Sequence, residues 1–109
     1  MNLNIKEKEM IKTEILNVNG NPVEGVLINA PGGEGHPNML VMVCKKGYVM
    51  CGYLNMGTAD AVKDAACVIS GASFEDLLKN PVKTVSAEGE KLGLKVGMTG
   101  AEACDVLNK

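Results

Sequence analysis

Hydrophobic positions in the first part of the chain follow the short period that is typical of strands. Apolar residues alternate or run together over Met10–Val18 and Val23–Asn29, which predicts two strands. The Asn19-Gly20 step between them supplies the positive φ angles that a tight hairpin turn needs. Because polar and apolar residues do not separate cleanly on the first strand, we expect it at an edge of the sheet.

A second hairpin is predicted where the chain is almost continuously apolar. The strands Met39–Cys44 and Tyr48–Leu54 flank a turn at Lys45-Lys46-Gly47, and their apolar character indicates that both faces are covered. These strands are therefore expected in the centre of the sheet. The segment Pro31–Asn38, which joins the two hairpins, contains three glycines and two prolines and is predicted to be a loop.

The second half of the chain alternates helix signals with short strands. Thr58 is the predicted N-cap of a short helix, which precedes a buried strand over Ala65–Ser70. A strand, a short helix and a strand in succession predict a parallel crossover. Ser73 and Thr99 begin the capping signatures of two further helices, and Val82–Ala87 alternates as a strand does.

These elements predict an α+β protein. The expected architecture is a two-layer sandwich with a mixed sheet, built from N-terminal hairpins plus short βαβ crossovers, with the helices mainly on one face. A chain of 109 residues is long enough to form one hydrophobic core. We predict a single domain over residues 10–109, preceded by a disordered or loosely held segment over residues 1–9.

The composition argues against nucleic-acid and membrane partners. All eleven basic residues are lysines, thirteen residues are acidic and the pI is near 5.3, so no arginine is present to grip phosphates. Three aromatic residues are too few for a platform that stacks bases. The first residues lack the apolar core of a signal peptide, and no apolar stretch is long enough to span a bilayer. We therefore expect a cytoplasmic protein.

The cysteines are predicted to be buried free thiols. Their spacing matches neither a zinc site nor a disulfide framework, so no metal and no cofactor is predicted; they are Cys44, Cys51, Cys67 and Cys104. Cys51 is the candidate nucleophile, provided that Gly52 opens a path for a substrate beside it. His36, the only histidine, is predicted to be a solvated loop residue, with a catalytic or metal-binding role as the alternative.

Four segments of the chain together resemble a known family. They are Lys46–Asn55, Asp64–Ala66, Phe74–Leu78 and Leu92–Ala103. In this order and spacing they are similar to the YunC-like family (domain of unknown function 1805), whose members are small bacterial and archaeal proteins. The resemblance implies a compact α+β two-layer sandwich over most of the chain, and it implies no activity, substrate or catalytic residue.

A ligand site is expected beyond the carboxyl ends of the parallel strands, where loops and helix N-termini converge. The predicted topology places five residues there: Asn55, Thr58, Ser70, Gly71 and Ser73. Their amides and hydroxyls favour a small cytoplasmic domain that binds a small polar metabolite. One alternative is a thiol-dependent enzyme that uses Cys51. Another is a homo-oligomeric assembly module, because seven methionines can supply soft apolar contact surface.

Overall fold

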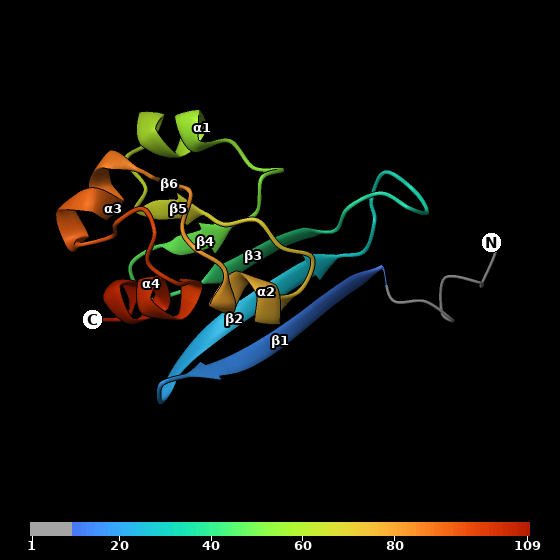
Figure 1. The fold of residues 1–109 in the computed structure, drawn as a ribbon, viewed down its shortest axis with the longest axis horizontal. Helices are drawn as coiled ribbons and strands as arrows, with labels where there is room; N and C mark the ends of the chain where they lie inside the picture. The colour runs from blue at the N-terminus through green and yellow to red at the C-terminus, as the bar shows by residue number, and fades with distance from the viewer. Residues whose placement is uncertain (1–9) are drawn as a thin grey trace.

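The computed structural model describes residues 10–109, which form a six-stranded sheet and four helices (Figure 1). The strands are β1 (Ile11–Val18), β2 (Asn21–Ile28), β3 (Met39–Val43), β4 (Tyr48–Met50), β5 (Ala66–Val68) and β6 (Thr84–Val85). The helices are α1 (Met56–Ala61), α2 (Phe74–Lys79), α3 (Ala87–Leu92) and α4 (Gly100–Leu107). The predicted α+β class is confirmed, whereas the prediction of a loosely held segment over residues 1–9 falls outside the described residues. None of these four helices is long and apolar enough to cross a membrane.

The strands lie in the sheet in the same order as in the sequence. β4 and β5 are parallel and are joined by α1, and each other neighbouring pair is antiparallel. The edge position of β1 and the central positions of β3 and β4 are therefore confirmed. The unit β5-α2-β6 is not a second parallel crossover, because β6 returns antiparallel, with Lys83 N–H donating to the Val68 carbonyl at 2.8 Å.

The first hairpin turns at Asn19-Gly20, as predicted. Both residues have a positive φ, 52° and 88°, which is the pattern of a type I′ turn. The Asn17 side chain accepts a hydrogen bond from the second of them at 2.9 Å. β2 begins two residues earlier than predicted, so Pro22 lies within the strand. The strand tolerates this proline because its ladder with β3 begins only at Glu24.

The connection from β4 to α1 differs from the prediction. β4 ends at Met50 rather than at Leu54, because the chain turns after Cys51. Asn55 then caps α1, where the sequence predicts Thr58 as the cap. Both residue types are good N-caps, and Asn55 prevails because its side-chain oxygen accepts two backbone N–H groups of the first turn.

Side-chain alternation along the strands divides the sheet into two faces with different cover. On one face α2 and α4 pack against the sheet and form the main core (Figure 1). Residues of this core that are at most 1% exposed include Val23, Leu40, Met42, Val49, Leu77 and Leu107. On the opposite face Ala59 of α1 packs against Met50 and Ala66. The rest of that face is open, and Ile15 and Val43 are 66% and 43% exposed there.

Ser86 is the only polar side chain among residues 10–109 that is fully buried. Its Oγ accepts the N–H groups of Ala66 and Gly89 at 2.9 and 3.0 Å, and it donates to the Asp64 carbonyl at 2.7 Å. One hydroxyl therefore joins the start of β5 to the first turn of α3.

The first turn of α4 lies directly against α2. Thr99 and Glu102 form the predicted capping box at this helix start. Gly100 follows the cap, and a β-carbon at this position would overlap the carbonyl oxygen of Leu77 in α2. The glycine therefore sets how closely the two helices approach each other.

Candidate functional site

The connections that follow the two parallel strands border an open cavity of about 260 Å³, the rim cavity. Its lining comes from the glycine-rich loop Pro31–Asn38, from the β4–α1 connection and from the β5–α2 connection. The lining residues are Pro37, Asn38, Cys51, Gly52, Tyr53, Ser70 and Gly71. The cavity lies at the carboxyl ends of β4 and β5, which is where ligands gather in sheets with parallel crossovers.

Asn38 ties the walls of the rim cavity together. Its Oδ1 accepts the N–H of Ala30 at 2.9 Å, and its Nδ2 donates to the Ala72 carbonyl at 2.9 Å. These two bonds close the base of the glycine-rich loop and fix it to the β5–α2 connection. The Tyr53 hydroxyl adds a longer contact, 3.5 Å, to the Pro37 carbonyl. Segments far apart in the sequence thus form one wall.

The hydrogen-bond donors that the rim cavity offers are uncharged groups. Among residues 10–109, no charged side chain lines this cavity. Cys51 is 3% exposed, and its Sγ accepts the N–H of Leu40 at 3.3 Å. The N–H groups of Gly52, Ser70 and Gly71 donate to no other group within residues 10–109. These N–H groups and the Ser70 hydroxyl are therefore available to a ligand that carries acceptor oxygens.

The other predicted site residues lie outside the rim cavity. Asn55 and Thr58 line a separate hollow of about 560 Å³ over the open face of the sheet, the open-face hollow. The Asn55 Oδ1 already accepts backbone N–H groups as the cap of α1. Ser73 caps α2 by accepting the Asp76 N–H at 3.1 Å and lines neither space. The rim cavity brings together three of the predicted residues, namely Cys51, Ser70 and Gly71.

Tyr48 also borders the open-face hollow. Its hydroxyl donates to Oδ2 of Asp64 at 2.6 Å. Burial, together with this hydrogen bond and the carboxylate charge, raises the pKa of Tyr48 to about 12. The phenol therefore stays neutral near pH 7 and acts as a fixed structural donor.

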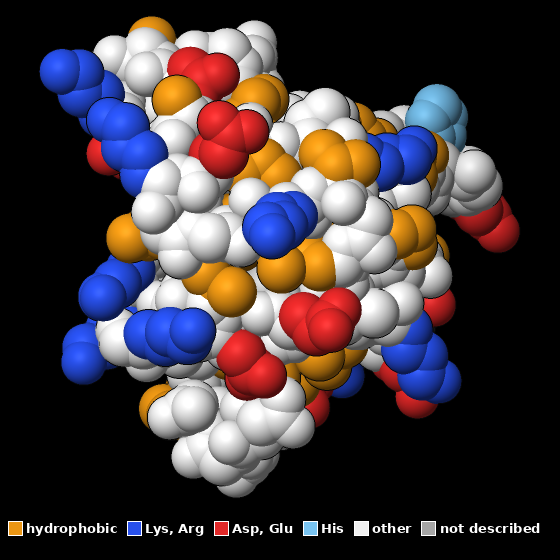
Figure 2. Space-filling view, turned by 60° about the vertical axis from the view of Figure 1, so that its left-hand side comes forward, with side chains coloured by type: hydrophobic (Ala, Val, Ile, Leu, Met, Phe, Trp, Pro, Cys, Tyr) orange, Lys and Arg blue, Asp and Glu red, His pale blue; other side chains and the backbone are white. Residues whose placement is uncertain are grey.

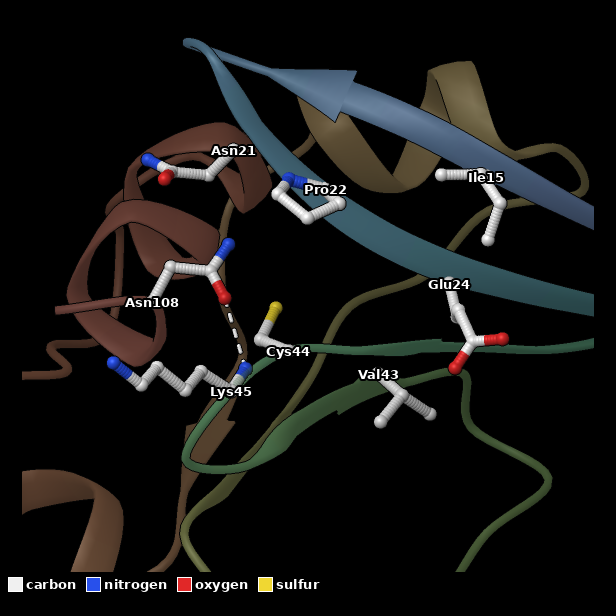
Figure 3. A pocket seen from close by; sticks show the side chains of 8 residues that line it. All are labelled: Ile15, Asn21, Pro22, Glu24, Val43, Cys44, Lys45 and Asn108. Carbon is white, nitrogen blue, oxygen red and sulfur yellow. Dashed lines mark hydrogen bonds between the residues drawn. The ribbon is translucent and has the colours of Figure 1, made fainter.

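A third cavity, of about 530 Å³, opens where β2 and β3 separate (Figure 3). The β2–β3 ladder ends at Glu24, and Pro22 has no N–H with which to extend it. The Lys45 N–H bonds instead to Oδ1 of Asn108 at 2.8 Å. The residues that line this Cys44 cavity are Ile15, Asn21, Pro22, Glu24, Val43, Cys44, Lys45 and Asn108.

The Cys44 cavity contains a thiol that is paired with a second thiol. A hydrogen bond between Cys44 and Cys104 lowers the pKa of Cys44 and raises that of Cys104, which burial raises further. Burial also raises the pKa of Cys67 to about 12, with a contribution from Cys44. The sequence gives no sign of this pair, because only the packing of α4 on the sheet brings the two cysteines together.

His36 takes no part in these cavities. It is exposed in the glycine-rich loop, where a β-carbon added at Gly32 would meet its imidazole at 3.0 Å. In the part of the chain that the structure describes, no group of three or more histidine, cysteine, aspartate or glutamate side chains is arranged to hold a metal ion. On the face shown in Figure 2, lysine and acidic side chains are interspersed with apolar ones.

Comparisons with known proteins find similar chains whose activity is not described. The chain is 27% identical over 99 residues to the uncharacterized protein YunC of Bacillus subtilis (strain 168), which covers 86% of this chain and 94% of that relative. The crystal structure of TA1206, a protein of unknown function from Thermoplasma acidophilum, matches with a TM-score of 0.81 and 29% identity over 91% of this chain and 94% of that one. The family described as Domain of unknown function (DUF1805) matches residues 50–107, which include the rim-cavity residues of β4–α1 and β5–α2. The predicted resemblance is confirmed, and the chain belongs to this DUF1805 family.

Proposed function

We propose that the protein binds a small polar molecule in the rim cavity. One observation chiefly supports this function: free backbone N–H groups and a free hydroxyl line an uncharged cavity at the carboxyl ends of two parallel strands. Such donors suit a carbonyl or carboxylate oxygen. Pro37 and Tyr53 offer apolar surface to the rest of the ligand. The volume of about 260 Å³ is large enough for a small metabolite.

We also place this function in the cytoplasm. All four cysteines are free, and each is buried. Free thiols in this number are typical of proteins that work in a reducing compartment.

A thermal-shift screen tests the proposed binding. A bound ligand adds roughly 2.7 kcal/mol to the free energy of unfolding at a hundred times its dissociation constant. We expect at least one compound in a library of small carboxylic acids, amides and ketones to raise the Tm of the wild type. The variant Gly52→Leu should lose this rise. A β-carbon at Gly52 meets no atom within 4 Å, so the leucine side chain begins in open space beside the cavity.

The matched control for this screen is Thr58→Leu, which adds bulk to the open-face hollow instead. This variant should keep the rise in Tm. A rise that Thr58→Leu removes and Gly52→Leu retains would move the site to the open-face hollow. The proposal would be contradicted if no compound in the library raised the Tm of the wild type at millimolar concentration.

A second candidate function, thiol chemistry, is favoured by Cys44 rather than by Cys51. The hydrogen bond from Cys104 lowers the pKa of Cys44, which favours the reactive thiolate. Cys44 also lines a cavity together with Lys45 and Asn108. The Nδ2 atom of Asn108 is buried and has no partner within the described residues, so a donor is left unused beside this cavity.

Iodoacetamide labelling of the native protein, read out by peptide mass mapping, distinguishes the thiols. We expect Cys44 to react first, at a pH below that at which an ordinary cysteine reacts. Cys51 should react more slowly because it is only 3% exposed, and Cys67 and Cys104 should stay protected because they are 0% exposed. The variant Cys104→Ala should return the pH dependence of Cys44 labelling toward that of an ordinary thiol.

Two results of the labelling experiment would count against Cys44. Faster labelling of Cys51 would restore the thiol of the rim cavity as the candidate nucleophile. An unchanged pH dependence in Cys104→Ala would show that the thiol pair does not activate Cys44.

A further inference from the structure

The outer edge of β1 carries a self-complementary sequence. Within residues 10–109, β1 pairs only with β2, and Figure 1 shows it along the margin of the sheet. Its first five residues read Ile11-Lys12-Thr13-Glu14-Ile15. We propose that two copies of the protein associate through this edge, with the two β1 strands antiparallel and Thr13 on the two-fold axis. The sheets of both copies then form one continuous sheet.

The hydrogen-bonding phase of β1 fits this register. The Met10 carbonyl accepts the Asn29 N–H at 2.8 Å, so Met10 and every second residue after it direct their backbone groups to β2. Ile11, Thr13 and Ile15 therefore direct their N–H and C=O groups outward. In the proposed register Thr13 pairs with Thr13 of the second copy, and Ile11 pairs with Ile15. All three are then hydrogen-bonded pairs.

Lys12 and Glu14 supply charge complementarity in the same register. Each lysine lies opposite the glutamate of the second copy, in the non-hydrogen-bonded pairs where side chains approach most closely. Within one copy the two side chains form only a loose ion pair, 3.7 Å long, and are 50% and 44% exposed. A register centred one residue to either side would place lysine against lysine or glutamate against glutamate. The charges therefore select the axis at Thr13.

The apolar residues of this edge favour the same pairing. Ile11 and Ile15 are 61% and 66% exposed on the open face of the sheet. In the dimer Ile11 of each copy lies directly opposite Ile15 of the other copy. Such cross-strand pairs of β-branched side chains stabilise sheets. A strand of eight residues whose outer edge has no partner within residues 10–109, and which carries exposed apolar side chains, is a template for strand addition.

Charge reversal tests the interface by analytical ultracentrifugation. We expect a reversible dimer of the wild type. Lys12→Glu and Glu14→Lys should each weaken dimerisation by about tenfold or more, because two like-charged pairs replace two ion pairs. An equimolar mixture of the two variants should dimerise again, since an acidic edge then faces a basic one. Lys79→Glu, which reverses an exposed lysine in α2, should leave dimerisation unchanged.

Cysteine substitution tests the register. The axis brings the two Thr13 Cα atoms to about 5.5 Å, a distance that a disulfide can span. Mild oxidation should therefore link Thr13→Cys into a covalent dimer, whereas Ile15→Cys should stay unlinked because its own copy lies several residues away. Intact mass gives the linked fraction, and circular dichroism shows that each variant is folded. The proposal is overturned by a wild type that stays monomeric at millimolar concentration, by charge reversals without effect, or by equal linkage of the two cysteine variants.

Discussion

Replacing Ser86 with alanine is expected to lower the free energy of unfolding by about 3 kcal/mol. The hydroxyl is fully buried and satisfies three backbone groups, the N–H groups of Ala66 and Gly89 and the carbonyl of Asp64. Alanine leaves all three without a partner in the interior, and each unsatisfied buried group costs about 1–3 kcal/mol before relaxation. Urea denaturation followed by circular dichroism measures the loss.

The control is Ser73→Ala, which removes the N-cap of α2. Ser73 is half-buried and accepts a single backbone N–H, that of Asp76. The loss of this cap should cost about 1 kcal/mol. Ser86 is itself the N-cap of α3 through its bond from the Gly89 N–H. If Ser86→Ala costs no more than Ser73→Ala, capping alone explains the role of Ser86, and its other buried hydrogen bonds contribute nothing further.

Replacing Gly100 with alanine is expected to cost about 3–5 kcal/mol or to prevent folding. Helix propensity alone predicts the opposite sign, because alanine is favoured over glycine in helices by about 1 kcal/mol. The structure reverses this expectation, since the new β-carbon would overlap the Leu77 carbonyl oxygen. The oxygen belongs to the backbone of α2, and the backbone of α4 fixes the position of the β-carbon, so the two helices would have to move apart and open the main core. Thermal and urea denaturation give the size of the loss.

Gly52→Ala is the matched control for this substitution. A β-carbon at Gly52 meets no atom within 4 Å, so the change in stability should stay within about 0.5 kcal/mol. Equal stability of Gly100→Ala and Gly52→Ala would mean that α2 and α4 do not approach as closely as they do in this structure.

Local signals in the sequence predict much of the fold. The Asn19-Gly20 step predicts its turn because few residue pairs adopt two positive φ angles so readily. Ser73 and Thr99 are both found as caps, because the capping pattern depends on residues within one turn. The start of α1 is less certain from sequence, since Asn55 and Thr58 are both suitable caps and only the turn after Cys51 decides between them.

The candidate sites are less predictable because they depend on contacts between distant segments. Of the five residues that the carboxyl-end rule groups together, the rim cavity includes Ser70 and Gly71 and leaves out the other three. The rule says nothing of Asn38, which reaches the rim cavity from a loop between antiparallel strands. The sequence separation of Cys44 and Cys104 also gives no sign of their contact, because that contact requires α4 to lie on the sheet.

Part of the cover of the sheet comes from α4, which lies far along the chain from the hairpins on which it packs. The Lys46 N–H at the β3–β4 turn donates to the Leu107 carbonyl at 2.8 Å, and Ala103, Cys104 and Leu107 are fully buried in the main core. On the ribosome, the hairpins β1–β2 and β3–β4 emerge first and can pair locally. Their apolar face stays partly uncovered until α4 has been made. Truncation before α4 should therefore produce an aggregating rather than a smaller folded protein.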